Sequence, residues 1–332
     1  MGSPWSPRPA EPGAVGVKAF RIRNEEKTMT ATKHCLALAV LALFGLTGAP
    51  AAAGDWRQDY PELTLGVITA ENEADRVARY GPVRDYFEQA LGVRITWRTA
   101  TDYAGIIEGV KAGKIQIARF GPASYAKAWM VTKGEIEPLV GEIDNYGAFG
   151  YHAVVIVRKD SDFRSLDDLK GRKLAFADPN STSGHQAPRF FLREAGYDVD
   201  SHFSETGFSG SHENSVVALL NGTFDAAATW WRNDDYSNMT RMEDKGMIDK
   251  GQWRIVWTSP KLPSSPWAMS NTLPEAMRHD VQAMLLDMKD KAPEAWQSLT
   301  DGKAQSLRKV THQDYEAVVR MIEANQKDRR GS

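Results

Sequence analysis

The chain alternates short apolar runs with segments whose apolar residues recur every three or four positions. The runs 62–68, 93–99 and 151–158 are apolar or alternate apolar with polar residues, which predicts strands. The segment 80–92 places its apolar residues on one face and ends in glycine, which predicts a helix. Strands that alternate with helices in this way predict an α/β fold of mainly parallel sheets flanked by helices.

One unit of helix, glycine and strand occurs twice. Residues Tyr103–Ala118 align without gaps with His212–Ala227, 109 positions later. Either two generic α/β units agree by coincidence, or the chain contains two similar lobes. Because ligands bind at the ends of strands in such sheets, two lobes would form a cleft. Tyr103 and His212 would then face that cleft from opposite walls.

A loop rich in hydroxyl groups lies between a predicted buried strand at 173–177 and a predicted helix at 187–196. It contains Ser181, Thr182 and Ser183 in succession. The first N–H groups of a helix have no partner within the helix and carry partial positive charge. Three hydroxyls beside them can hold a tetrahedral oxyanion. The alternative is that one residue merely caps the helix, but a cap requires only one such side chain.

Other polar residues are candidates for binding. His212 precedes a predicted helix and could donate a hydrogen bond to an anion. The adjacent Trp230 and Trp231, with Asp234 or Asp235, could contact a cationic ligand tail through cation–π and charge pairing. The ordinary interpretation is a core tryptophan and a solvated acidic pair.

Several functional classes are excluded by missing patterns. The sequence contains neither a G-x-S-x-G nucleophile elbow nor a tight metal-ligand spacing among its seven histidines, so no catalytic residue, metal or cofactor is predicted. The formal net charge of −2 and the lack of a basic stripe argue against nucleic-acid binding.

The N-terminus has the features of an export signal. Residues 29–53 combine a short basic start, an apolar run and a small-residue end, which predicts a cleaved signal peptide. Residues 1–28 fit no secretory pattern, and we interpret them as an extension from a wrongly assigned start codon. Cleavage near Ala53 would remove the only cysteine, Cys35, and leave 35 basic and 40 acidic residues, a net charge of −5. We therefore expect a periplasmic protein without disulfides.

Five motifs together resemble one family. The stretches "DYAGIIEG", "IQIARFGPASY", "GYHAVVIV", "DPNSTSG" and "GSHENSV" are similar to those of the periplasmic phosphonate-binding protein of an ATP-driven phosphonate importer. The resemblance implies a two-lobed type II periplasmic binding protein fold with the ligand cleft between the lobes. Lobe I would comprise 54–149 and 258–332, and lobe II 150–257.

The resemblance also implies roles for individual residues. Ser181, Thr182 and Ser183 would hold the phosphonate oxygens, Tyr103 and His212 would contact the same group, and Tyr151 would line the pocket.

Recognition of the ligand's tail departs from the family's pattern. Relatives that bind 2-aminoethylphosphonate use two carboxylates for the ammonium group. The first maps near Asp234, and Ser265 occupies the segment that should hold the second. The resemblance leaves open 2-aminoethylphosphonate, methylphosphonate, phosphite and a methylated-ammonium phosphonate as ligands.

The expected function is capture of a phosphonate between two lobes and delivery to the membrane permease of an ABC importer, by a protein that is expected to be monomeric. Alternatives are a phosphite, phosphate or sulfate binding protein and a ligand-sensing partner of a membrane receptor. A periplasmic phosphoester or phosphonate hydrolase is the alternative from another class.

Overall fold

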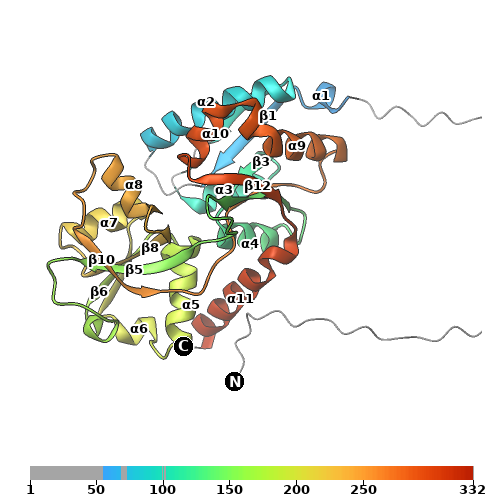
Figure 1. Ribbon diagram of the computed structural model, residues 1–332. Helices are drawn as coiled ribbons and strands as arrows, with labels where there is room; N and C mark the ends of the chain where they lie inside the picture. Colours follow the sequence, from blue (N-terminus) through green and yellow to red (C-terminus); the bar gives the residue numbers. More distant parts are fainter. Residues whose placement is uncertain (1–54, 69–72, 99, 101, 332) are drawn as a thin grey trace, which may run out of the picture. The chain divides into compact units, whose positions relative to one another are not determined.

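The computed structural model describes residues 55–68, 73–98, 100 and 102–331 (Figure 1). The predicted extension 1–28 and the predicted signal peptide 29–53, with Cys35, lie outside the described residues. Within the described part of the chain, no helix is both long and apolar enough to span a membrane.

The first sheet has the strand order β12-β4-β11-β3-β1-β2. Its strands are β1 (Glu62–Val67), β2 (Arg94–Arg98), β3 (Ile117–Arg119), β4 (Glu137–Asp144), β11 (Pro266–Met269) and β12 (Ala304–Lys309). The helices that belong with it are α1 (Trp56–Asp59), α2 (Glu73–Leu91), α3 (Tyr103–Lys111), α4 (Pro122–Val131), α9 (Glu275–Lys291) and α10 (Pro293–Thr300). The core of this half includes the fully buried Trp267, which packs against Phe87 of α2.

The second sheet has the strand order β10-β5-β8-β6-β7, and β9 pairs with β8. Its strands are β5 (His152–Arg158), β6 (Lys173–Phe176), β7 (Glu205–Phe208), β8 (Ala226–Asn233), β9 (Tyr236–Ser237) and β10 (Trp253–Thr258). The associated helical segments are a 3-10 turn (Asp167–Leu169), a π-helical turn (Thr182–Gln186), α5 (Ala187–Glu194), α6 (Val199–His202), α7 (His212–Leu220) and α8 (Asn238–Asp244).

The repeated unit predicted from the sequence is confirmed. Helices α3 and α7 begin at Tyr103 and His212, respectively, and are followed by β3 and β8. Each helix ends just before a glycine in the left-handed region, Gly113 with φ 68° and Gly222 with φ 78°. Glycine adopts this conformation at little cost, so it ends both helices in the same way.

The sheets contain more antiparallel pairing than expected. β1 pairs in parallel with β2 and β3, and β6 pairs in parallel with β7 and β8. However, β11 lies antiparallel between β3 and β4, and β5 is antiparallel to both β8 and β10. These antiparallel strands lie next to the segments where the chain crosses between the sheets. Apolar periodicity identifies a strand but carries no information about the direction of its neighbour.

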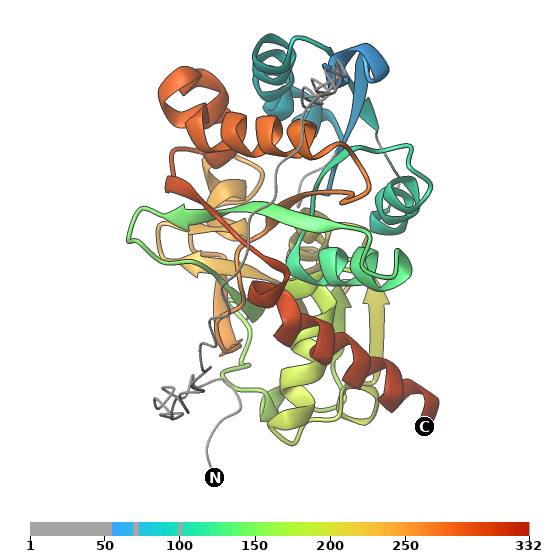
Figure 2. The same ribbon diagram turned by 90° about the vertical axis from the view of Figure 1, so that its right-hand side faces the viewer.

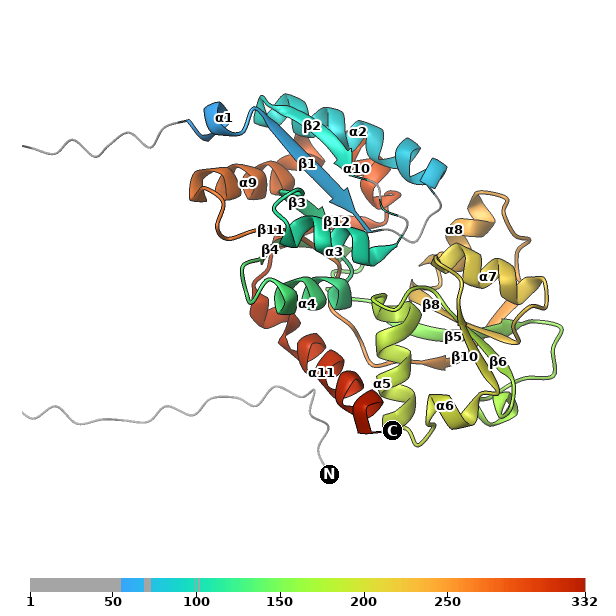
Figure 3. The same cartoon turned by 180° about the vertical axis from the view of Figure 1, so that it is seen from behind.

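The chain passes from the first sheet to the second after β4 and returns after β10. The two crossing segments are joined by backbone hydrogen bonds in both directions between Tyr151 and Leu262, of 3.0 and 2.8 Å. A 3-10 turn (His312–Tyr315) leads into the last helix, α11 (Glu316–Gly331), which lies beside α4 and α5 (Figures 2 and 3). Crossing segments and α11 therefore connect the two sheets.

Gly150 lies in the first crossing segment, next to Tyr151. Its φ is 140°, and a Cβ at this position would lie 2.3 Å from the carbonyl oxygen of Leu262. We expect Gly150→Ala to lower the free energy of unfolding by about 3 kcal/mol, since backbone strain and the steric clash add. Urea unfolding measures the change.

Gly147→Ala is the matched control. Gly147 also has a positive φ, 79°, but a Cβ there would meet nothing within 4 Å. Only the conformational cost of about 1 kcal/mol is expected. Equal losses in the two variants would contradict the tight contact at Gly150.

Candidate functional site

The N-termini of four helical segments meet at one cavity. Tyr103 begins α3, Gly121 caps α4, Ser181 caps the π-helical turn that continues into α5, and His212 begins α7. All four residues line the cavity. The positive ends of four helix dipoles therefore gather there, which favours an anion.

The cavity has a volume of about 110 Å³. Drug-sized ligands occupy pockets of roughly 300–1,000 Å³, so this cavity suits a small molecule. Its walls come from elements associated with both sheets. Among the residues that line it are six predicted from the sequence: Tyr103, Tyr151, Ser181, Thr182, Ser183 and His212.

The hydroxyl groups of the Ser-Thr-Ser loop have different partners. The Ser181 side chain accepts from the N–H of Gly184, at 3.1 Å, and so caps its own helix. Thr182 Oγ1 accepts from the N–H of Ala123 in the first turn of α4, at 2.8 Å, across the two halves. Tyr151 forms hydrogen bonds to the side chains of Thr182 and Ser183. One residue therefore acts as the cap, and the others orient hydroxyls at the cavity.

His212 is a buried, neutral hydrogen-bonding group. Its Nε2 lies 3.1 Å from Ser181 Oγ and its Nδ1 lies 3.1 Å from Thr229 Oγ1. Burial lowers the pKa of His212 to about 4. Burial also raises the pKa of Tyr151 to about 12. Near pH 7 both side chains are uncharged, so they can bind an anion through hydrogen bonds without adding charge.

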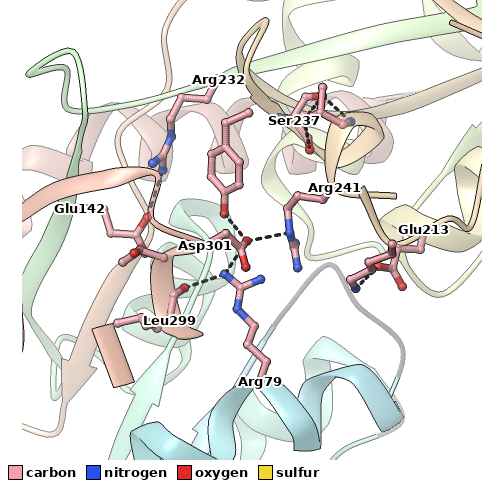
Figure 4. A network of polar contacts seen from close by, with 12 residues as sticks. Arg79, Glu142, Glu213, Arg232, Ser237, Arg241, Leu299 and Asp301 are labelled. Atoms are coloured by element: carbon pink, nitrogen blue, oxygen red, sulfur yellow. Dashed lines mark hydrogen bonds and ion pairs between the residues drawn. The ribbon is translucent and has the colours of Figure 1, made fainter. Parts of the chain in front are cut away.

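A second group of lining residues is charged, and the sequence interpretation missed it. Arg79, Arg119, Arg232 and Arg241 line the cavity together with Glu142. Glu142 accepts from Arg119 at 2.6 Å. It also accepts from Arg232 at 3.2 Å (Figure 4). Burial would raise the pKa of Glu142, but the two guanidinium groups lower it to about 2. The carboxylate is therefore ionised at neutral pH.

Asp301 forms a second ion-pair centre beside the cavity. Its carboxylate lies 3.0 Å from nitrogens of both Arg79 and Arg241 (Figure 4). It also accepts from the Tyr236 hydroxyl at 3.0 Å. Asp301 follows α10, whereas Tyr236 and Arg241 belong to β9 and α8. The contacts of Asp301 therefore link elements of the two sheets.

The remaining predicted residue lies elsewhere. Asp234 is exposed in the turn between β8 and β9 and is not among the residues that line the cavity. Its neighbour Asp235 accepts from the Tyr146 hydroxyl at 2.5 Å, at the surface. Trp230 and Ser265 do line the cavity. No group of three or more His, Cys, Asp or Glu suited to a metal occurs among the described residues.

Burial of His212 predicts a specific pH dependence. A histidine has a pKa near 6.5 when unfolded, so between pH 6.5 and 4 the unfolded chain binds a proton that the folded chain excludes. His212 should therefore lower the free energy of unfolding by about 2 kcal/mol when the pH falls from 7 to 5. Urea unfolding of the ligand-free protein at both pH values should show this loss reduced in His212→Gln.

His279→Gln serves as the control because the His279 side chain is 70% exposed. It should keep the wild-type pH dependence. If His212→Gln lost as much free energy of unfolding between pH 7 and pH 5 as the wild type, a different buried group would be responsible. His212 would then take up a proton in the folded protein.

Comparison with known proteins identifies the family. The sequence profile described as "ABC transporter, phosphonate, periplasmic substrate-binding protein" matches residues 65–326. The phosphate-import protein PhnD of Mycolicibacterium smegmatis is 32% identical over 317 residues, covering 90% of this chain and 96% of that protein. The phosphonates-binding periplasmic protein of Escherichia coli is 29% identical over 266 residues, covering 79% and 76%.

A solved structure agrees with these matches. The binding protein component of an ABC phosphonate transporter from Pseudomonas aeruginosa matches with a TM-score of 0.71 and 25% identity, over 80% of this chain and 87% of that chain. The expected α/β type II periplasmic binding protein fold is confirmed. These matches are to substrate-binding proteins of transporters, so they support a binding role and not the hydrolase alternative. The chain thus belongs to the family of periplasmic substrate-binding proteins of phosphonate ABC transporters.

Proposed function

We propose that this protein captures a small phosphonate in the cavity at the four helix N-termini and delivers it to the membrane permease of an ABC importer. The observation that carries the proposal is the Ser181–Ser183 loop, with Tyr103 and His212 beside it in one cavity. The protein acts as a monomer in the periplasm, after cleavage of a signal peptide near Ala53. Ser181, Thr182, Ser183, Tyr103, Tyr151 and His212 bind the phosphonate head.

Capture requires contacts from two lobes. We assign residues 54–149 and 258–332 to lobe I and residues 150–257 to lobe II. The lobes move about the crossing segments near Gly150 and Leu262. A buried phosphonate head is tolerated only when its oxygens accept hydrogen bonds. A ligand shifts the balance between open and closed forms only through groups that it contacts better in the closed form. Tyr103 from one lobe and Ser183 and His212 from the other meet this requirement.

Inorganic phosphate is the second candidate ligand. The Mycolicibacterium smegmatis relative is named as a phosphate-import protein. Glu142 supplies an ionised carboxylate at the cavity, and such a group can accept the proton of a P–OH group. A phosphonate lacks one of the oxygens of phosphate, so relative affinities for the two ligands distinguish the candidates.

The binding residues can be tested one at a time. We expect Ser183→Ala and Tyr103→Phe each to weaken ligand binding roughly ten- to hundredfold, because each removes a hydrogen bond to a charged group. Isothermal titration calorimetry measures the affinities, and the melting temperature shows whether folding is intact. Ser204→Ala, at an exposed serine outside the cavity, is the control and should bind normally.

The combined variant Ser181→Ala/Thr182→Ala/Ser183→Ala gives the decisive result for the site. If it folds and binds with full affinity, the head group does not occupy this loop.

A ligand panel tests the function itself. The protein is titrated with methylphosphonate, phosphite, 2-aminoethylphosphonate, inorganic phosphate and sulfate. Tight binding of a phosphonate with weak binding of phosphate is the expected result, because the sequence profile that matches this chain describes phosphonate transporters. Strong binding of phosphate alone would favour the second candidate, and strong binding of sulfate alone would contradict both.

A further inference from the structure

The side of the cavity formed by Arg119, Glu142 and Arg232 carries excess positive charge. Two guanidinium groups share one carboxylate, which leaves 2 − 1 = +1. All three side chains are largely buried, with exposures of 15%, 6% and 9%. Removal of charge from water is costly unless it is compensated, so an uncompensated positive charge at a cavity favours an anion.

The hydrogen bonds of Arg232 are also incomplete. Its Nη2 donates to Glu142 at 3.2 Å, but its Nε and Nη1 are buried and have no hydrogen-bond partner among the described residues. Its guanidinium lies 5.5 Å from the centre of the Tyr236 ring, which fixes it from one side. A buried N–H without an acceptor costs free energy, so an oxygen acceptor that reaches this side chain would stabilise it.

These residues do not fit a cationic ligand tail. An ammonium group has only donors and cannot satisfy the guanidinium N–H groups. Glu142, the carboxylate among the lining residues, is already bound by two arginines. Asp234, which the family resemblance assigns to ammonium recognition, is exposed outside the cavity, and Ser265 is uncharged. An aminoalkyl tail would therefore meet repulsion without compensation.

Resting on the proposed function, we propose that the ligand is a phosphonate with a second anionic group, a carboxylate a few bonds from phosphorus. The phosphonate head binds at the Ser181–Ser183 loop, and the carboxylate accepts hydrogen bonds from Arg232. Arg119 adds favourable charge at the same wall. A carboxylate is the natural complement, because a guanidinium and a carboxylate combine charge attraction with directional hydrogen bonds.

Three ligands of similar size test the tail. Phosphonoacetate carries a carboxylate, ethylphosphonate a methyl group and 2-aminoethylphosphonate an ammonium group. In calorimetric titrations we expect phosphonoacetate to bind roughly ten- to hundredfold more tightly than ethylphosphonate. We expect 2-aminoethylphosphonate to bind more weakly than ethylphosphonate.

Variants of Arg232 assign this preference to a residue. In Arg232→Gln the preference for phosphonoacetate over ethylphosphonate, taken as the ratio of the two affinities within the variant, should fall to roughly threefold or less, because the tail loses its charged partner. Arg232→Lys keeps the charge and should retain part of the preference even if Arg232→Gln folds poorly. Arg278→Gln is the control, since Arg278 pairs with Glu137 outside this cavity.

The possible failures are distinguishable. Equal affinity for phosphonoacetate and ethylphosphonate would overturn the inference and leave the proposed function intact. If 2-aminoethylphosphonate bound most tightly of the three ligands and Glu142→Gln abolished that preference, this side of the cavity would recognise an ammonium group instead. If none of these phosphonates, methylphosphonate or phosphate binds, the proposed function fails, and the inference fails with it.

Discussion

The architecture of this protein depends on an electrostatic constraint: four helix N-termini point at one small volume. Positive dipole ends repel one another when they converge in a region of low dielectric. The hydrogen bond from the Ala123 N–H to Thr182 Oγ1 offsets part of this repulsion by joining the first turn of α4 to the π-helical turn. An anion in the cavity would offset more of it. In the proposed function, the placement of the helices therefore favours an anion before any single side chain is considered.

Two parts of the cavity lining differ in charge. Around the loop, His212 and Tyr151 are uncharged near neutral pH, so they can offer hydrogen bonds without charge. Elsewhere in the lining, Arg119 and Arg232 share Glu142, which leaves a net positive charge. In the proposed binding mode, hydrogen-bond geometry selects the tetrahedral head, while net charge discriminates between tails that differ in sign. A neutral wall alone would not distinguish these tails.

The sequence predicts those residues of the site that are close together in the chain or that recur in a repeat. Ser181–Ser183 form a continuous stretch with its own strand and helix, and Tyr103 and His212 begin two copies of one repeated unit, so both patterns were readable. Arg119, Glu142 and Arg232 come from three strands. Their proximity depends on strand order, including the insertion of β11 between β3 and β4, which periodicity does not encode.

The same limit explains Asp234. The family resemblance assigned Asp234 to the ammonium group, but the β8–β9 hairpin places this aspartate at the surface, whereas Arg232 lies at the cavity. Charged residues at the ends of buried strands, such as Arg119 in β3, were the signal available for the missed wall. A buried strand seldom carries a charge without a partner.

Tyr151 links the two crossing segments to the Ser181–Ser183 loop. Its backbone forms the bridge to Leu262 between the two crossing segments, while its hydroxyl contacts Thr182 and Ser183. One residue thus belongs both to the crossing segments and to the lining of the cavity. In a protein that opens about this bridge, affinity and release rate are mechanically coupled. In such a protein, a substitution that changes how the bridge opens would also change how firmly the ligand is held.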